Sequence, residues 1–278
     1  MKPFIVKSSG EKERFSEKKL KTSLLRAGTT PRVARDASTF VSGGIFEGMS
    51  SDDIYRRALR YLISHDAPTA VKYSLKKAIF RLGPAGYMFE QYVARILQED
   101  GYATDVGVTV AGKCVSYEID VVATKGNKRL FVECKYHNNP GIKSDLKVAL
   151  YVQARYEDIL QARGRKDTFS NEGWIVTNTK CTSQAISYAE CVGLSIFAWR
   201  YPHGGGLESM IESKRLYPIT ILPSLSLYAL ERLSQEGMLL AGDIMNIDAE
   251  KVSKKLSLQT SDLLQAQREA HMICNGGV

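Results

Sequence analysis

Three carboxylates and one lysine lie on two short apolar runs near the middle of the chain. Glu118 and Asp120 belong to the first run, and Glu133 and Lys135 belong to the second. Carboxylate oxygens are the ligands that a hard cation such as Mg²⁺ takes, with water and substrate phosphate completing its shell. A neighbouring ammonium group can orient the attacking water or stabilise charge on the phosphorus oxygens. These residue types therefore indicate a metal site for phosphoryl chemistry.

The spacing of the two runs predicts a β-hairpin. Residues 115–123 and 129–136 are rich in Val, Ile, Tyr and Phe, and Gly126-Asn127 lies between them. A Gly-Asn pair is typical of a two-residue hairpin turn, because Gly tolerates the positive φ that the turn requires. The two runs are therefore expected to pair as antiparallel strands.

A turn at this place determines which side chains face each other. Asp120 is expected opposite Glu133, and Glu118 opposite Lys135, with all four on one face of the sheet. The alternative is a solvated face with cross-strand ion pairs, which explains Glu118 with Lys135. It does not explain Asp120 beside Glu133, since like charges in that position are destabilising without a cation. The pattern therefore favours a metal site.

These residues also resemble a known nuclease family. Asp120 followed by Glu133-x-Lys135 resembles the PD-(D/E)xK nuclease core, and the surrounding chain resembles the Mrr-type restriction endonuclease domain. The resemblance covers about residues 86–199. It includes further segments on both sides of the hairpin: Phe89-Glu90, Gln153 and Trp174-Ile175-Val176-Thr177-Asn178-Thr179-Lys180.

The resemblance implies a metal-dependent DNA endonuclease with a mixed sheet flanked by helices. It makes Asp120 and Glu133 the ligands of Mg²⁺, with Mn²⁺ as the alternative, and Lys135 the residue that orients water. It makes Glu90 an accessory ligand, and Gln153 a residue that positions the substrate or the metal shell. From the residues alone, Glu90 can instead be a solvated carboxylate at the border of an apolar stripe. Gln153 can instead satisfy buried backbone groups.

Composition is typical of a cytoplasmic protein. The chain has 278 residues, 44% of them hydrophobic, and no uncharged apolar stretch of 18 residues, so no membrane span is expected. Charged residues interrupt the N-terminus before a signal-peptide core can form. Its five cysteines are odd in number and have no CxxC spacing, which favours reduced thiols over disulfides or a zinc site.

The net charge of +8 is concentrated in the first third of the chain. Residues 1–85 carry 17 Lys and Arg against 8 Asp and Glu, a balance of +9. Residues 86–217 carry +1 and residues 218–278 carry −2. This excess indicates a polyphosphate or nucleic-acid partner for the N-terminal part.

The pattern predicts three domains of an α/β protein: 1–83, 84–217 and 218–278, with a boundary in the Gly83 to Gly86 segment. Ser16 is expected to cap a helix, and Ser51 to cap another that begins with two acidic residues. Helices are predicted over about 31–41, 52–64, 69–80, 144–162 and 183–191. Strands are predicted over 4–6, 174–177 and 194–199, besides the hairpin.

The N-terminal domain resembles an ATP-cone, the regulatory nucleotide-binding domain of ribonucleotide reductases and their repressors. The fit covers about residues 4–82, including Ile5-Val6-Lys7, Gly10, Phe15, Lys19-Leu20, Leu24-Leu25 and Ala27-Gly28. The resemblance implies binding of ATP or dATP, with Lys7 and Lys19 as phosphate contacts. The alternative is a basic helical domain that packs on DNA or on a neighbouring subunit.

The C-terminal segment has a faint resemblance to helix-hairpin-helix modules, and its negative charge favours a dimerisation or lid element instead. The whole chain is therefore expected to be an Mg²⁺-dependent DNA endonuclease of defence or DNA repair. ATP or dATP is expected as its regulatory input, and a homo-oligomer as its assembly. The competing hypothesis is a non-catalytic, nucleotide-sensing regulator that binds nucleic acid.

Overall fold

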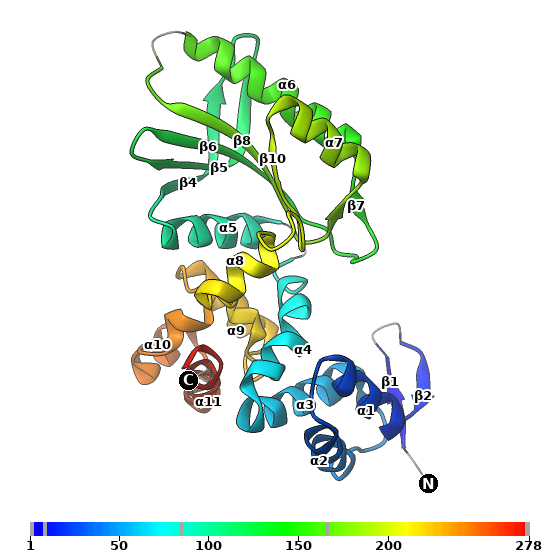
Figure 1. The fold of residues 1–278 in the computed structure, drawn as a ribbon. Coiled ribbons are helices and arrows are strands. Elements are labelled where there is room, and N and C mark those ends of the chain that lie inside the picture. Colours follow the sequence, from blue (N-terminus) through cyan, green and yellow to red (C-terminus); the bar gives the residue numbers. More distant parts are fainter. Residues whose placement is uncertain (1–2, 8–9, 84–85, 165–166, 276–278) are drawn as a thin grey trace. The chain divides into compact units, whose positions relative to one another are not determined.

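A computed structural model describes residues 3–7, 10–83, 86–164 and 167–275 of the chain. The chain divides into two compact units (Figure 1). One combines residues 1–78 with residues 217–278, and the other comprises residues 79–216. The expected domain boundary after residue 83 falls at residues 84–85, which lie outside the described residues.

The first unit begins with a small sheet followed by helices. Strand β1 (Phe4–Val6) pairs antiparallel with β2 (Lys12–Arg14) and parallel with β3 (Met49–Ser50). The predicted strand at residues 4–6 is confirmed. Three of the helices end within two residues of their predicted limits. The helices of this part are α1 (Glu17–Arg26), α2 (Pro31–Ser42), α3 (Ser51–His65) and α4 (Ala67–Ile79).

Side-chain caps explain where α1 and α3 begin. Ser16 caps α1 by accepting a hydrogen bond from Lys19 N, as predicted. Helix α3 is capped by Ser50, whose hydroxyl accepts a hydrogen bond from Asp53 N at 3.0 Å. The prediction of Ser51 as the cap is therefore wrong by one residue, because Ser50 holds the extended backbone that a cap needs while Ser51 is already helical.

The C-terminal segment packs in the same unit as the N-terminal helices. Thr220 Oγ1 donates a hydrogen bond to Ala78 O at 2.7 Å, and Arg60 lies 4.0 Å from the carboxylate of Glu269. Glu269 is 1% exposed and accepts a hydrogen bond from Ser224 N. The segment expected as a separate C-terminal domain thus shares a core with α3 and α4. Its elements are η2 (Ile219–Ile221), α9 (Leu227–Gln235), η3 (Ala241–Ile244), α10 (Ala249–Leu256) and α11 (Thr260–Asn275).

The second unit is built on a mixed sheet with the strand order β10-β8-β6-β5-β4. Strands β4, β5 and β6 pair antiparallel, whereas β6, β8 and β10 pair parallel. The mixed sheet that the sequence predicted is confirmed, and β4 is an additional edge strand. The strands are β4 (Ala103–Ala111), β5 (Ser116–Lys125), β6 (Lys128–Lys135), β8 (Ser170–Thr177) and β10 (Ser195–Phe197).

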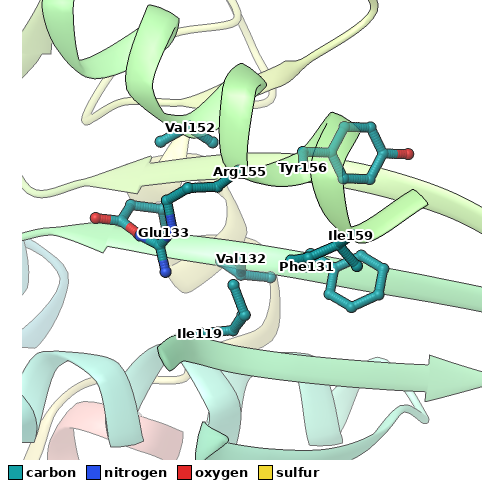
Figure 2. A pocket seen from close by; sticks show the side chains of 8 residues that line it. All are labelled: Ile119, Phe131, Val132, Glu133, Val152, Arg155, Tyr156 and Ile159. Atoms are coloured by element: carbon teal, nitrogen blue, oxygen red, sulfur yellow. The ribbon is translucent and has the colours of Figure 1, made fainter. Parts of the chain in front are cut away.

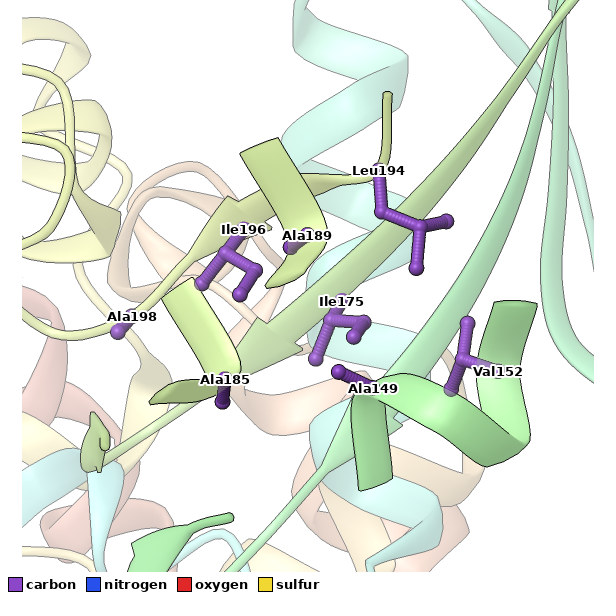
Figure 3. Packing of buried hydrophobic residues seen from close by; sticks show 8 residues of the cluster. All are labelled: Ala149, Val152, Ile175, Ala185, Ala189, Leu194, Ile196 and Ala198. Carbon is purple, nitrogen blue, oxygen red and sulfur yellow. The ribbon is translucent and has the colours of Figure 1, made fainter. Parts of the chain in front are cut away.

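Helices cover both faces of this sheet (Figure 1). Helix α5 (Tyr87–Glu99) lies on one face, and α6 (Leu146–Arg163) and α7 (Ser183–Val192) lie on the other. Beneath α6, Ile159 packs with Ile119 of β5 and Phe131 of β6 (Figure 2). Alanines of α6 and α7 let the two helices approach β8 and β10 closely (Figure 3). A short helix, α8 (Leu207–Lys214), completes the unit.

The predicted hairpin register is confirmed over the paired residues. The ladder runs from Lys125 opposite Lys128 to Val121 opposite Val132, with no slip. The ladder between β5 and β6 ends at Val121, so the expected pair of Asp120 with Glu133 is not formed. The ladder between β5 and β4 is interrupted at the same residue, Asp120. On the other side of the strand, Gly107 has a φ of 65° and interrupts the pairing of β4 with β5.

The prediction that all four site side chains share one face does not hold for Glu118. Ile119 packs under α6 together with Phe131, so its neighbour Glu118 points toward the α5 face. Glu133 lies two residues beyond Phe131 on β6 and therefore faces the same side of the sheet, where its carboxylate contacts α6. The interruption of the strand at Asp120 is the reason that simple alternation fails. Among the helices of the described residues, none is both long and apolar enough to cross a membrane.

Candidate active site

The end of β6 carries Glu133 into contact with an arginine of α6. Arg155 Nη1 donates a hydrogen bond to Glu133 Oε2 at 2.7 Å, and the two side chains are 10% and 16% exposed. Figure 2 shows both side chains in the pocket that α6 covers. Arg155 also donates to the backbone carbonyl of Glu118, and its Nε is buried without a hydrogen-bond partner in the described part of the chain. This arginine therefore neutralises Glu133 from within the fold.

Asp120 is fixed against the strand that carries the Glu-x-Lys motif. Its Oδ2 accepts a hydrogen bond from Cys134 N at 2.6 Å. Cys134 lies between Glu133 and Lys135, so this bond holds Asp120 beside both of them where the ladder has ended. Three of the residues that the sequence predicted as a site are thus brought together.

The carboxylates of this group are held in an environment that disfavours their charge. Burial raises the pKa of Asp120, and burial followed by the charge of Asp120 raises the pKa of Glu133. Arg155 and Lys135 act on both carboxylates in the opposite direction. The uncompensated negative charge would favour a bound cation.

Glu90 belongs to the same electrostatic group from the α5 side. Burial, and then the charges of Asp120, Glu118 and Glu133, raise the pKa of Glu90 to about 7. A carboxylate on a solvated outer surface would not feel three other carboxylates in this way. Glu90 is therefore linked electrostatically to the carboxylates of the candidate site.

The donor set fits a hard divalent cation, with one rearrangement. Within the described residues, no three His, Cys, Asp or Glu side chains are already grouped as a metal-binding set. The oxygen of Glu133 that faces α6 is taken by Arg155. For Glu133 to give both oxygens to a cation shared with Asp120 and Glu90, Arg155 has to release it. Carboxylate oxygen donors suit Mg²⁺ or Mn²⁺ better than a soft metal.

Gln153 points into the fold, but its hydrogen bond goes along its own helix. Its Nε2 donates to Glu157 Oε1 at 2.7 Å, and its Oε1 is buried without a hydrogen-bond partner in the described part of the chain. Among the described residues, Gln153 has neither a hydrogen bond to the site carboxylates nor the alternative side-chain bond to buried backbone. Its role as a positioning residue stays a prediction.

Two residues of the site region were not identified from the sequence. Arg155 carried no signal, because a lone arginine on a helix is ordinarily a solvated residue. Asn178 is fully buried, and its amide both accepts from His137 N and donates to His137 O, each at 2.8 Å. This clamp fixes the backbone just after Lys135. A polar triplet directly after an apolar strand, Thr177 to Thr179, was the available signal.

We expect the raised pKa of Glu90 to make the metal-free protein less stable as the pH rises from about 4.5 to about 7. The folded state holds this proton more tightly than the unfolded chain does, so the contribution to stability is full below the ordinary pKa and is lost above the raised one. Thermal unfolding across this pH range, for the wild type and Glu90→Gln, measures the effect. The variant should show a shallower fall, and an identical slope would contradict the assignment.

Two family models match the chain. A restriction endonuclease model matches residues 84–200, and an AF1548-like C-terminal model matches residues 217–274. The first match contains every residue of the candidate site. No comparison shows an ATP-cone in the N-terminal part.

One relative and two solved structures illustrate what this chain is similar to. An uncharacterised protein of Archaeoglobus fulgidus is 38% identical over 181 residues, which are 65% of this chain and 99% of that protein. The crystal structure of AF1548, a protein of unknown function, is 38% identical, with a TM-score of 0.59 over 69% of this chain and 99% of that one. A structure of the MspJI restriction endonuclease with a 27-mer oligonucleotide is 14% identical, with a TM-score of only 0.26 over 68% of this chain and 45% of that one.

Proposed function

We propose, for a chain that belongs to the AF1548-like family and carries a restriction endonuclease-like domain, that it is a metal-dependent DNA endonuclease. One observation carries the proposal. Asp120 of β5 is hydrogen-bonded to the backbone between Glu133 and Lys135 of β6, and the charges of Asp120 and Glu133 act on Glu90 of α5. A group of this composition is costly to bury without a cation, which makes a purely structural role a poor explanation.

Each residue has a role that its position supports. Asp120, Glu133 and Glu90 would hold Mg²⁺ or Mn²⁺, which supplies activation of water and neutralisation of charge on the phosphate. Lys135, two residues beyond Glu133 on β6, would donate hydrogen bonds to the attacking water or to a phosphate oxygen. Gln153 would position the substrate. The reaction breaks the P–O bond to the leaving oxygen as the water oxygen bonds to phosphorus.

Cleavage across a panel of DNA substrates tests this function. The panel comprises unmodified, modified, single-stranded and branched DNA, incubated with Mg²⁺, with Mn²⁺ or with a chelator. The proposed endonuclease cuts at least one substrate only when the metal is present. Retarded migration of DNA without any cutting would favour the competing function, a regulator that binds nucleic acid.

A second proposal is that ATP or dATP binds the first unit as a regulatory ligand. The observation that favours it is that both lysines pair with the same carboxylate. Glu13 Oε2 lies 3.1 Å from Lys7 Nζ and 3.0 Å from Lys19 Nζ. The two predicted phosphate contacts are therefore neighbours, although they are twelve residues apart. Lys19 also lines a surface hollow together with Tyr55 and Tyr73, whose stacked rings offer apolar contact to a nucleobase.

Lys19→Ala and Lys7→Ala should each weaken nucleotide binding by roughly tenfold, because each removes a charge-assisted contact to phosphate. Calorimetric titration of the full chain with ATP and dATP measures this. Lys21→Ala is the matched control, since Lys21 lies on the same helix but does not line the hollow. Absence of binding at millimolar nucleotide would remove the proposal. Binding that both substitutions leave unchanged would place the nucleotide elsewhere.

A further inference from the structure

Two lysines face each other on a short ribbon that adjoins the end of the catalytic strand. Strand β7 (Lys143–Ser144) pairs parallel with β9 (Lys180–Cys181), and Lys143 is the direct partner of Lys180. Both lysines are exposed. Side chains of directly paired residues project from the same face, so two ammonium groups are set side by side.

A buried polar network ties this ribbon to β6. Lys135 is paired with Thr177 on β8, three residues before Lys180. Beyond that pair, the Asn178 amide clamps the backbone of His137, and a ring nitrogen of His137 lies 3.0 Å from the hydroxyl of Ser144. The ribbon therefore has a fixed position relative to Lys135, and its lysines are not on a free loop.

The charges of the two lysines are not balanced locally. Neither Lys143 nor Lys180 has an ion pair with any described residue, and like charges directly opposite each other destabilise a strand pair. The nearest acidic residue along the chain, Asp145, is occupied as the cap of α6, where it accepts hydrogen bonds from the first backbone amides.

A second pair of facing lysines shows how the same fold compensates such a contact. Lys125 and Lys128 are directly paired at the turn of the hairpin, at the other end of β6. Lys125 donates a hydrogen bond to the carbonyl of Asp100, and Lys128 forms an ion pair with Glu172 at 2.7 Å. The charges of the lysine pair at the turn are therefore compensated by neighbouring groups. Among the described residues, the charges of Lys143 and Lys180 beside the candidate site are not.

We propose that Lys143 and Lys180 bind backbone phosphates of the DNA strand that occupies the site. This inference rests on the proposed function and adds a binding site to it. A phosphodiester supplies the negative charge that the ribbon lacks, and lysine provides a point charge that contacts phosphate without reading sequence. The buried network around Asn178 then serves to hold this phosphate contact in register with Lys135.

Binding of a DNA duplex without divalent metal tests the inference separately from cleavage. The measurement is fluorescence anisotropy over a series of salt concentrations for the wild type and for Lys143→Ala/Lys180→Ala. Each lost phosphate contact should reduce the slope of log affinity against log salt by about 0.9. The double variant should therefore lose about 1.8 in slope and at least roughly tenfold in affinity at low salt.

Two further variants separate a phosphate contact from general effects of charge and stability. Lys125→Ala/Lys128→Ala removes the same charge from the same domain and should bind DNA nearly as the wild type does. Lys143→Glu creates an opposite-charge pair with Lys180, so its melting temperature should be unchanged or higher while its DNA affinity falls.

Equal loss of affinity in both double variants, or wild-type affinity in Lys143→Ala/Lys180→Ala, would overturn the inference. A wild-type chain that does not bind DNA would overturn it as well. If the wild type binds DNA through these lysines but never cuts it, the endonuclease function fails and this binding site stands.

Discussion

Asp120→Asn, Glu133→Gln and Lys135→Met should each lower the rate of DNA cleavage by at least about 10²-fold. The first two substitutions keep the size of a candidate metal ligand and remove its charge, and the third removes the ammonium group. Glu133 and Lys135 lie at the end of β6, and Asp120 of β5 accepts a hydrogen bond from the backbone N–H between them. Single-turnover cleavage rates at saturating enzyme measure the loss.

Asp120→Asn should retain folding and DNA affinity, because neutralising Asp120 relieves its repulsion of Glu133. Glu133→Gln leaves Arg155 buried without its charged partner, so this variant should be less stable, and thermal unfolding has to show that it is folded at the assay temperature. Glu172→Gln is a suitable control, since Glu172 is a paired carboxylate on the neighbouring β8. It should cleave DNA at close to the wild-type rate. Cleavage at the wild-type rate by any one of the three site variants would refute the assignment of that residue.

Arg155→Met should destabilise the metal-free protein by roughly 3–5 kcal/mol, because it leaves Glu133 buried without its partner. Mg²⁺ should restore much of that stability, since the substitution removes the cation that competes for Glu133 Oε2. The variant should therefore bind Mg²⁺ more tightly than the wild type. Thermal unfolding with and without Mg²⁺, and calorimetric metal titration, measure the two effects.

The pair formed by Arg129 and Asp167 provides a matched control. It is nearly as buried as the pair of Arg155 with Glu133, has a distance of 2.9 Å, and includes none of the candidate site residues. Arg129→Met should destabilise the protein by less than Arg155→Met, because Asp167 keeps Asn171 and Arg163 as partners, and its effect should be the same with or without Mg²⁺. An Arg155→Met variant that Mg²⁺ fails to rescue, or one that binds Mg²⁺ no better than the wild type, would show that Arg155 does not compete with a metal.

Local patterns were sufficient to predict the parts of the fold that depend on local chemistry. The Gly126-Asn127 turn set the hairpin register, because a two-residue turn leaves no freedom in the pairing. Ser16 was identified as the N-cap of α1 because its hydroxyl bonds a backbone N–H only three residues away, that of Lys19. Strand β4 was missed, since as an edge strand with Gly107 in its middle it lacks the apolar density of a central strand.

Features that depend on packing between distant segments could not be predicted. The face of Glu118 depends on the interruption of β5 at Asp120, which requires β4 to be known. The ion pair of Arg155 with Glu133 joins residues on two elements whose approach is set by the core beneath α6. The grouping of Glu269 with Arg60 joins opposite ends of the sequence, so composition alone suggested separate domains.

The most direct test of the central claim is a side-by-side cleavage assay of the wild type and Glu133→Gln, purified identically, over a titration of Mg²⁺. Glu133 belongs to the Glu-x-Lys motif, bonds the arginine of α6 and is a proposed ligand of the metal. We predict that the wild type cuts DNA with a rate that rises with Mg²⁺ and vanishes with a chelator, and that Glu133→Gln does not cut at any Mg²⁺ concentration. Cleavage that is independent of metal, or equal cleavage by both proteins, would contradict the proposed active site.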